Sequence, residues 1–345
     1  MTPSVRPQEQ LLVELLPELA AGRMLCNTVG RAQFAAAFTA GQSAAHATCW
    51  FLDLYQLQQS RREAGPLPAN LRLICEADPP AEDFDLVVWV FSRQGDGELV
   101  REMLQTGHER LAIGDRMIAA IDNPRDQWLH EQMRKIFFKV TRRASENGVV
   151  YLATKTQPLR KIKNYAAEFA FRDGARLIHL RTRPGVFSHR ELDGGARALI
   201  KALPAGAAII ADLGCGSGAV GIAAALRREF SRVHSLDSNP RAVEATRWAA
   251  KQNGLGSRVM ALLDCDGQGL VPGVHDLVLA NPPYYSNHRI DQLFVAIAER
   301  ALTPGGWLLL VTKFPGWFEE RLGAGFSDVQ ARQIGHYVVV AGKRR

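Results

Sequence analysis

Cysteine is scarce in this chain, and long apolar runs are absent. The five cysteines among 345 residues are scattered and odd in number, without a C-x-x-C pair, which argues against both a disulfide framework and a zinc site. No apolar run reaches the roughly 18 residues that a membrane span needs, and the N-terminus lacks the pattern of a cleaved signal peptide. We therefore expect a soluble, cytoplasmic protein with no metal and no membrane partner.

Negative charge is also in the minority. The 42 lysines and arginines exceed the 35 acidic residues and give a net charge of +7, which favours a polyanionic partner. The basic residues gather between Arg134 and Arg190, in the middle of the chain. Such a run forms either a solvated helix face and hairpin or a surface for RNA, and its length favours RNA.

From Ala207 onward, short apolar runs alternate with helical patterns, as in AAIIADLG, AVGIAAALRREF and RVHSLD. This alternation is typical of a parallel sheet with crossover helices, which is the doubly wound α/β fold. Asn239-Pro240 predicts the start of a helix, and Pro304-Gly305-Gly306 predicts the end of another. The last segment, FSDVQARQIGHYVVVAGKR, predicts two strands joined by a turn at an antiparallel edge.

The first half shows a fainter version of the same pattern. A leading helix is followed by strand candidates at residues 23–27, 71–76, 84–91, 115–121 and 148–153. The sequence therefore predicts two Rossmann-like domains in tandem, a degenerate one over residues 1–165 and an intact one over residues 175–345. A basic, strand-poor connection is expected near residues 160–180.

A glycine-rich loop follows the apolar strand that ends near Asp212, an acid that we count with the loop among the cofactor-binding candidates. Gly214, Gly216 and Gly218 give the spacing G-x-G-x-G before a helix, where glycines permit a tight turn and backbone amides face a ligand at the helix N-terminus. The spacing differs from the dinucleotide fingerprint, and no Lys-Ser/Thr follows as in a P-loop. The loop therefore favours a nucleoside that carries a carboxylate over a diphosphate.

Carboxylates end the next two strands. Asp237 is placed to accept hydrogen bonds from both hydroxyls of an adenosine ribose, or to cap the following helix. Asp264, with Asp266 as the competing candidate, is placed to receive the adenine amine. Together with the glycine loop, these acids resemble the cofactor site of class I S-adenosylmethionine-dependent methyltransferases, a family whose catalytic domain is a doubly wound, seven-stranded sheet.

The fourth strand ends in Asn281-Pro282-Pro283-Tyr284, which resembles the N-P-P-aromatic motif of methyltransferases acting on planar nitrogens. An amine conjugated to a ring is a poor nucleophile because its lone pair is delocalised. The Asn281 side-chain oxygen and the Pro282 carbonyl are placed to hold that amine, and Tyr284 is placed to stack on the base. His288 and Arg289 either touch a substrate phosphate or begin a solvated helix, and we expect Trp307 and Trp317 to serve packing.

The segment P-G-V-F-S at residues 184–188, followed by Leu192-Asp193-Gly194-Gly195, looks like the corresponding part of the ribosomal RNA guanine-N2 methyltransferases of the RsmC and RlmG type. That family pairs a degenerate N-terminal domain with an active C-terminal one. The resemblance implies transfer of a methyl group from S-adenosylmethionine to N2 of a guanine in ribosomal RNA, either naked or in a partly assembled subunit. It also implies that Phe187, Ser188, Pro283 and Tyr285 lie against the substrate.

The chain departs from that family at Tyr284-Tyr285, where the family commonly has Phe-His. Because N-P-P-Y also occurs in adenine-N6 and protein glutamine-N5 methyltransferases, these activities remain alternatives, as does a non-catalytic RNA-binding assembly factor. In the first half, Thr28-Val29-Gly30 replaces the glycine loop and Phe91-Ser92-Arg93-Gln94 replaces N-P-P-aromatic. That half is therefore expected to support the active domain and to hold RNA.

Overall fold

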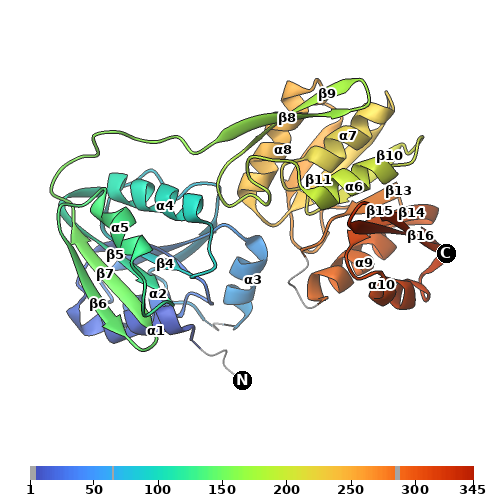
Figure 1. Ribbon diagram of the computed structural model, residues 1–345. Helices are drawn as coiled ribbons and strands as arrows, with labels where there is room; N and C mark the ends of the chain where they lie inside the picture. The colour runs from blue at the N-terminus through green and yellow to red at the C-terminus, as the bar shows by residue number, and fades with distance from the viewer. Residues whose placement is uncertain (1–4, 64–65, 284–287) are drawn as a thin grey trace. The chain divides into compact units, whose positions relative to one another are not determined.

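The computed structural model describes residues 5–63, 66–283 and 288–345, and each half of the chain forms its own α/β unit (Figure 1). The two compact units are Met1–Tyr165 and Ala166–Arg345. Each contains a seven-stranded sheet, and the second also carries a separate two-stranded sheet. The predicted α/β class with two Rossmann-like sheets is confirmed.

The C-terminal sheet consists of β10 (Ile209–Leu213), β11 (Arg232–Asp237), β12 (Val259–Leu263), β13 (His275–Ala280), β14 (Leu302–Thr312), β15 (Phe326–Ile334) and β16 (Tyr337–Arg344). Its strand order is β12-β11-β10-β13-β14-β16-β15. The first five strands in this order run parallel, and β16 pairs antiparallel with β14 and β15, which confirms the predicted antiparallel edge. All the parallel strands end at one edge, and in doubly wound sheets ligands bind at that carboxyl edge.

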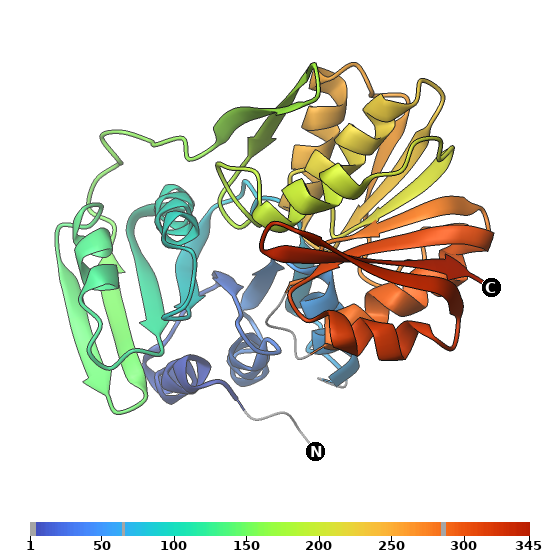
Figure 2. The same ribbon diagram turned by 45° about the vertical axis from the view of Figure 1, so that its right-hand side comes forward.

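Helices cover both faces of this sheet, as Figures 1 and 2 show. One face packs against α6 (Gly194–Ala202), α7 (Ala219–Arg227) and α8 (Pro240–Gln252). The other face packs against α9 (Arg289–Ala301) and α10 (Pro315–Leu322). Side chains on both faces of β10, β13 and β14 are buried under helices, which explains why these strands are apolar along nearly their whole length.

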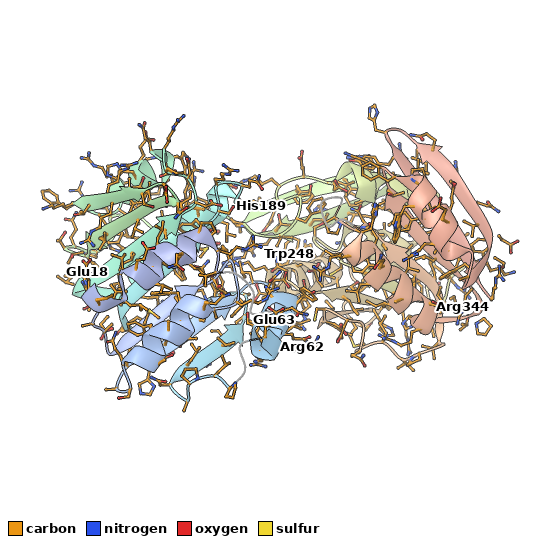
Figure 3. The ribbon with its side chains drawn as sticks, turned by 90° about the horizontal axis from the view of Figure 1, so that it is seen from below. Glu18, Arg62, Glu63, His189, Trp248 and Arg344 are labelled. Carbon is orange, nitrogen blue, oxygen red and sulfur yellow. The ribbon has the colours of Figure 1, made fainter. Side chains whose placement is uncertain are left out.

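The N-terminal sheet consists of β1 (Arg23–Asn27), β2 (His46–Phe51), β3 (Leu71–Cys75), β4 (Phe84–Phe91), β5 (Leu111–Ile121), β6 (Val140–Ser145) and β7 (Gly148–Thr154). It repeats the topology of the other sheet, with the order β3-β2-β1-β4-β5-β7-β6. The helices of this unit are α1 (Pro7–Glu14), α2 (Gln33–Gly41), α3 (Leu54–Glu63), α4 (Gly97–Glu109) and α5 (Trp128–Arg134). Glu18, on a 3₁₀ turn η1 (Leu16–Glu18), accepts a hydrogen bond from Arg143 of β6, and Figure 3 shows Glu18 on the opposite side of this unit from Arg62 and Glu63.

Two predictions about local structure were wrong. The connection expected to be strand-poor contains the hairpin β8 (Ala167–Asp173) and β9 (Arg176–Thr182), which turns at Gly174 with a φ of +59° and packs on α7 and α8. Asp173-Gly174 is the turn signal that identifies it. Pro304-Gly305-Gly306 does not end a helix but lies inside β14, where the register with β13 shifts.

Within residues 5–63, 66–283 and 288–345, none of the helices has the length and apolar content needed to cross a lipid bilayer.

Candidate functional site

The glycine loop joins β10 to α7 at the carboxyl edge of the C-terminal sheet. Gly214, Gly216 and Gly218 have φ values of +69°, +55° and +83°, a region that residues with a Cβ rarely adopt. There is also little room for a side chain at position 218, because a Cβ there would lie 3.0 Å from Oγ1 of Thr246 on α8. The loop thereby starts α7, and its own amides are engaged within the unit: those of Gly214 and Cys215 donate to the carbonyl of Leu236 and that of Gly218 donates to the carbonyl of Cys215.

Asp212 lies beneath this loop and is 3% exposed. Its Oδ2 accepts a hydrogen bond of 3.0 Å from the backbone N–H of Gly221, and a Cβ at Gly221 would lie 2.9 Å from the same oxygen. Burial raises the pKa of Asp212 to about 7; the Gly221 hydrogen bond opposes the shift, and the negative charge of Asp237 adds to it. Asp212 therefore anchors α7 to β10 at a cost in free energy when it is ionised.

We expect Asp212→Asn to stabilise the protein at pH 8, because the asparagine oxygen keeps the bond to Gly221 and no charge is buried. The unfolded chain ionises this group near pH 4 and the folded chain near pH 7. Wild-type stability relative to the variant should therefore fall as the pH rises from 4 to 7 and then stay constant, with a total change of at most about 4 kcal/mol. Unfolding midpoints of both proteins between pH 4.5 and 8.5 test this, and a difference that does not vary with pH would contradict it.

Asp237 ends β11 next to β10, and its carboxylate reaches the glycine loop. Oδ2 accepts a hydrogen bond of 2.9 Å from the N–H of Gly216, and Oδ1 accepts one of 2.9 Å from the N–H of Asn239. The sequence thus placed Asp237 beside the loop, and the structure adds that it fixes the loop's position.

Asp264 follows β12 and is engaged by its own loop. Its two oxygens accept hydrogen bonds from the N–H groups of Asp266 (2.8 Å), Gly267 (2.6 Å) and Gly269 (2.6 Å). This carboxylate organises the turn at residues 264–269, a role that accounts for an aspartate here without any ligand. Contact of Asp264 or Asp266 with adenine stays a prediction.

Asn281 follows β13 and is held by a residue that lies far away in sequence. Its Nδ2 donates a hydrogen bond of 2.8 Å to Oδ2 of Asp193, and the same oxygen caps α6 by accepting a 2.8 Å bond from the N–H of Ala196. An amide whose nitrogen faces Asp193 has its oxygen on the opposite side of the carboxamide group. The sequence pattern singled out Asn281 but assigned no role to Asp193.

The P-G-V-F-S segment is pinned to the start of α8. Asn239 donates from Nδ2 to the carbonyl of Gly185 (2.7 Å), and the buried guanidinium of Arg241 donates to the carbonyl of Pro184 (2.7 Å). The predicted helix start at Asn239-Pro240 is confirmed, with Asn239 as the cap. Figure 3 shows His189, next to this segment, on the same side of the unit as Trp248 of α8 and far from Arg344.

A cleft brings these parts together. It is lined by Phe187 and Ser188, by Asp193 of the α6 cap, by Asn281, and by the loop at residues 214–217. Pro282 is buried and Pro283 is half-buried at the end of β13. Tyr284 and Tyr285, which the sequence assigned to the substrate, lie outside the described residues.

In the N-terminal unit, a carboxylate from α1 occupies the corresponding loop. Oε1 of Glu9 accepts hydrogen bonds from the N–H groups of Val29 (3.1 Å) and Gly30 (2.9 Å) and from the hydroxyl of Thr28. Glu9 is 1% exposed. A side chain from α1 thus takes the amides of this loop, which the sequence pattern did not reveal, whereas in the C-terminal unit the amide of Gly216 donates to Asp237 of the neighbouring strand.

The chain was compared with known proteins. The family model described as "Methyltransferase small domain" matches residues 177–341. A ribosomal RNA large subunit methyltransferase G from Streptomyces avermitilis is 30% identical over 292 residues, which cover 78% of this chain and 74% of that protein. A ribosomal RNA small subunit methyltransferase C from Chromohalobacter salexigens is 34% identical over 181 residues, covering 48% of this chain and 53% of the relative. The matched part is thus about half of that relative's length.

The structural comparison extends over nearly the whole chain. A 16S ribosomal RNA N2-guanine methyltransferase (RsmC) from T. thermophilus, solved with AdoMet and guanosine, superposes with a TM-score of 0.81 at 21% identity. The match covers 99% of this chain and 94% of that one. At this identity the comparison establishes the fold of both units.

Proposed function

The chain belongs to the ribosomal RNA methyltransferase family of the RsmC and RlmG type, and we propose that it transfers a methyl group from S-adenosylmethionine to the N2 amine of a guanine in ribosomal RNA. The observation that carries this proposal is the pair formed by Asn281 and Asp193, 2.8 Å apart beside the glycine loop. It supplies an oriented hydrogen-bond acceptor where a planar amine must be aligned.

The residues around the loop suit an adenosine that carries an amino acid group. The N-terminus of α7, which follows the glycine loop, favours a carboxylate, and Asp237, at the end of β11, suits the two ribose hydroxyls. Phe187, which lines the cleft and is 55% exposed, gives the pocket an apolar wall. S-adenosylmethionine supplies, when bound, an electrophilic methyl group on a sulfonium.

Asn281 aligns the amine that receives the methyl group. Its Oδ1 and the carbonyl of Pro282 accept the two N–H groups of the guanine N2 amine, which leaves the nitrogen lone pair directed out of the ring plane. The new N–C bond forms as the C–S bond breaks, and the cationic nitrogen then loses a proton to water. Because this cationic, methylated nitrogen is strongly acidic, no dedicated base is needed to remove its proton.

The target guanine must be unpaired or extruded, because N2 of a paired guanine is engaged in base pairing. We therefore propose that the substrate is naked ribosomal RNA or a partly assembled subunit. The N-terminal unit, whose loop amides are taken by Glu9, is proposed to bind no cofactor and to support the catalytic unit and the RNA.

The test is transfer of labelled methyl groups from S-adenosylmethionine to total RNA or total protein from a strain that lacks this gene. We expect label in N2-methylguanosine from one ribosomal RNA. Label in N6-methyladenosine or in protein glutamine would move the assignment to the corresponding alternative, and absence of label in both RNA and protein would favour a non-catalytic assembly factor.

Asp193→Ala should lower kcat by about 100-fold while KM for RNA and affinity for S-adenosylmethionine stay within a few fold. Alanine removes Oδ2, the oxygen that accepts from both Nδ2 of Asn281 and the N–H of Ala196. The Asn281 amide then loses the contact with Asp193 that orients it toward the substrate. Steady-state kinetics with the folded variant test this, and a kcat within threefold of wild type would remove Asp193 from its positioning role.

Asp193→Asn and Asp193→Ser are the matched controls. An asparagine whose oxygen takes the position of Oδ2 can accept from both Nδ2 of Asn281 and the N–H of Ala196, so its kcat should stay within about threefold of wild type. A serine restores a cap for α6 with a shorter side chain that does not reach Asn281, so its kcat should stay low, a result that a merely structural effect on α6 would not produce.

A further inference from the structure

An exposed aromatic ring stands on a fixed turn at the same edge of the sheet as Asn281. Phe314 follows the end of β14 and is 56% exposed. Its N–H donates to Oγ1 of Thr312 at 2.9 Å, and Pro315 begins α10 directly after it. The backbone of Phe314 is therefore fixed at both ends, and the exposure of the ring is a feature of the turn.

The Phe314 ring packs against His288, which in turn stacks on Trp317. The imidazole of His288 stands edge-to-face to Phe314 at 6.5 Å between centroids and stacks on Trp317 of α10 at 4.6 Å with planes 6° apart. Nδ1 of His288 lies 2.8 Å from Oδ2 of Asp291. We call Phe314, His288 and Trp317 together the Phe314 shelf.

Tyr337 lies between the residue before Phe314 and the residue after Asp193. The ammonium of Lys313 lies over the ring of Tyr337 at 5.4 Å. The same tyrosine ring lies 2.9 Å from the Cβ position of Gly194, the residue after Asp193. Because β14 lies parallel and adjacent to β13, Phe314 and Asn281 both lie just beyond strand ends at one edge.

Space beside the ring is open. Apart from its chain neighbours and its own helix, no heavy atom of the described residues lies within 4 Å of a Cβ built on Gly316, so the start of α10 is open on this side. An RNA strand whose target base enters the cleft must also present the bases on either side of it, which lose their stacking partner when the target is extruded. An exposed ring offers such a base a sequence-tolerant stacking surface.

We propose that the Phe314 shelf is a second base subsite, in which Phe314 stacks on a nucleobase adjacent in sequence to the target guanine. The inference rests on the proposed function and extends it to RNA outside the target nucleotide. Phe187 lines the cleft with Asn281 and Phe314 does not, so Phe187 and Phe314 serve different parts of the RNA. The exposed Lys313 adds positive charge next to the phosphates of that strand.

The first measurement is the effect of Phe314→Ala on methylation of deproteinised ribosomal RNA by the full chain. KM for RNA should rise about tenfold, while kcat and the affinity for S-adenosylmethionine stay within twofold. Phe314→Trp should restore the wild-type KM, and Phe314→Leu, which keeps apolar volume without a ring face, should not. The control is Phe230→Ala, a ring 79% exposed just before β11 at the opposite edge, which should change KM by less than twofold.

The second measurement identifies the base that Phe314 contacts. After the methylated guanine is mapped, RNA oligonucleotides are prepared with an abasic nucleotide on its 5′ or its 3′ side. With wild-type protein, one of these should raise KM about tenfold, and with Phe314→Ala the same abasic nucleotide should have no further effect. Independent, multiplying effects for both neighbours would overturn the proposal.

The outcomes separate this inference from the proposed function. An active wild-type protein whose KM is unchanged by Phe314→Ala overturns the base subsite alone. If the wild-type protein methylates no RNA, both proposals fall.

Discussion

Asn281→Ala is expected to lower kcat for RNA methylation by about 100- to 1,000-fold, with little change in the affinity for S-adenosylmethionine. Removal of one pre-oriented polar group at a reacting centre typically has an effect of this size. Asn281 is held in a fixed geometry, because its Nδ2 lies 2.8 Å from Asp193. Single-turnover rates with saturating RNA, and calorimetric titration of the cofactor, measure the two quantities separately.

Asn281→Asp provides the matched comparison for this variant. Aspartate keeps an acceptor oxygen but loses the donor to Asp193, so two carboxylates would lie about as close as the present 2.8 Å pair. We expect a low kcat at neutral pH that recovers partly under acid conditions, as one carboxyl of the pair takes up a proton. Turnover near the wild-type level in Asn281→Ala would show that the amine is aligned by other groups.

Most strands that are buried on both faces could be predicted from the sequence, although the buried strand β2 (His46–Phe51) was missed. The strands β4 (Phe84–Phe91) and β11 (Arg232–Asp237) have the predicted bounds, because an apolar run between turn residues has few other solutions. The edge strand β6 (Val140–Ser145) is exposed along most of its length and carries Thr, Arg and Ser. Such strands are stabilised by backbone pairing with a neighbour, which local sequence does not encode.

The candidate site divides in a similar way. The glycine loop and the N-P-P turn could be found from sequence because each depends on residues within a few positions of one another. The partner of Asn281 lies 88 residues away, and the carboxylate of Glu9 that occupies the N-terminal loop lies 21 residues from Gly30. Contacts of this kind depend on tertiary packing, so pattern reasoning identified Asn281 and the loops but neither Asp193 nor Glu9.

Asp237→Ala is expected to weaken the binding of S-adenosylmethionine by about 100-fold, which corresponds to about 3 kcal/mol. Two effects combine in this loss. The proposed hydrogen bonds to the ribose hydroxyls disappear, and the glycine loop loses the 2.9 Å contact between Oδ2 and the N–H of Gly216 that fixes it. Titration of the cofactor, with the thermal unfolding midpoint as a check on folding, measures the result.

Asp237→Asn distinguishes the two contributions. An asparagine can keep one acceptor, for the N–H of Asn239 or that of Gly216 but not for both, and it replaces the second oxygen by a donor. If loop position dominates, Asn should bind the cofactor nearly as weakly as Ala, and binding of adenosine alone, which lacks the carboxylate, should weaken less than binding of the whole cofactor. If the ribose contacts dominate, S-adenosylmethionine should lose more affinity than a 2′-deoxy analogue, because the analogue already lacks one of the bonds. Unchanged affinity in both variants would show that Asp237 serves only to cap the start of α8, the second role that the sequence allows for it.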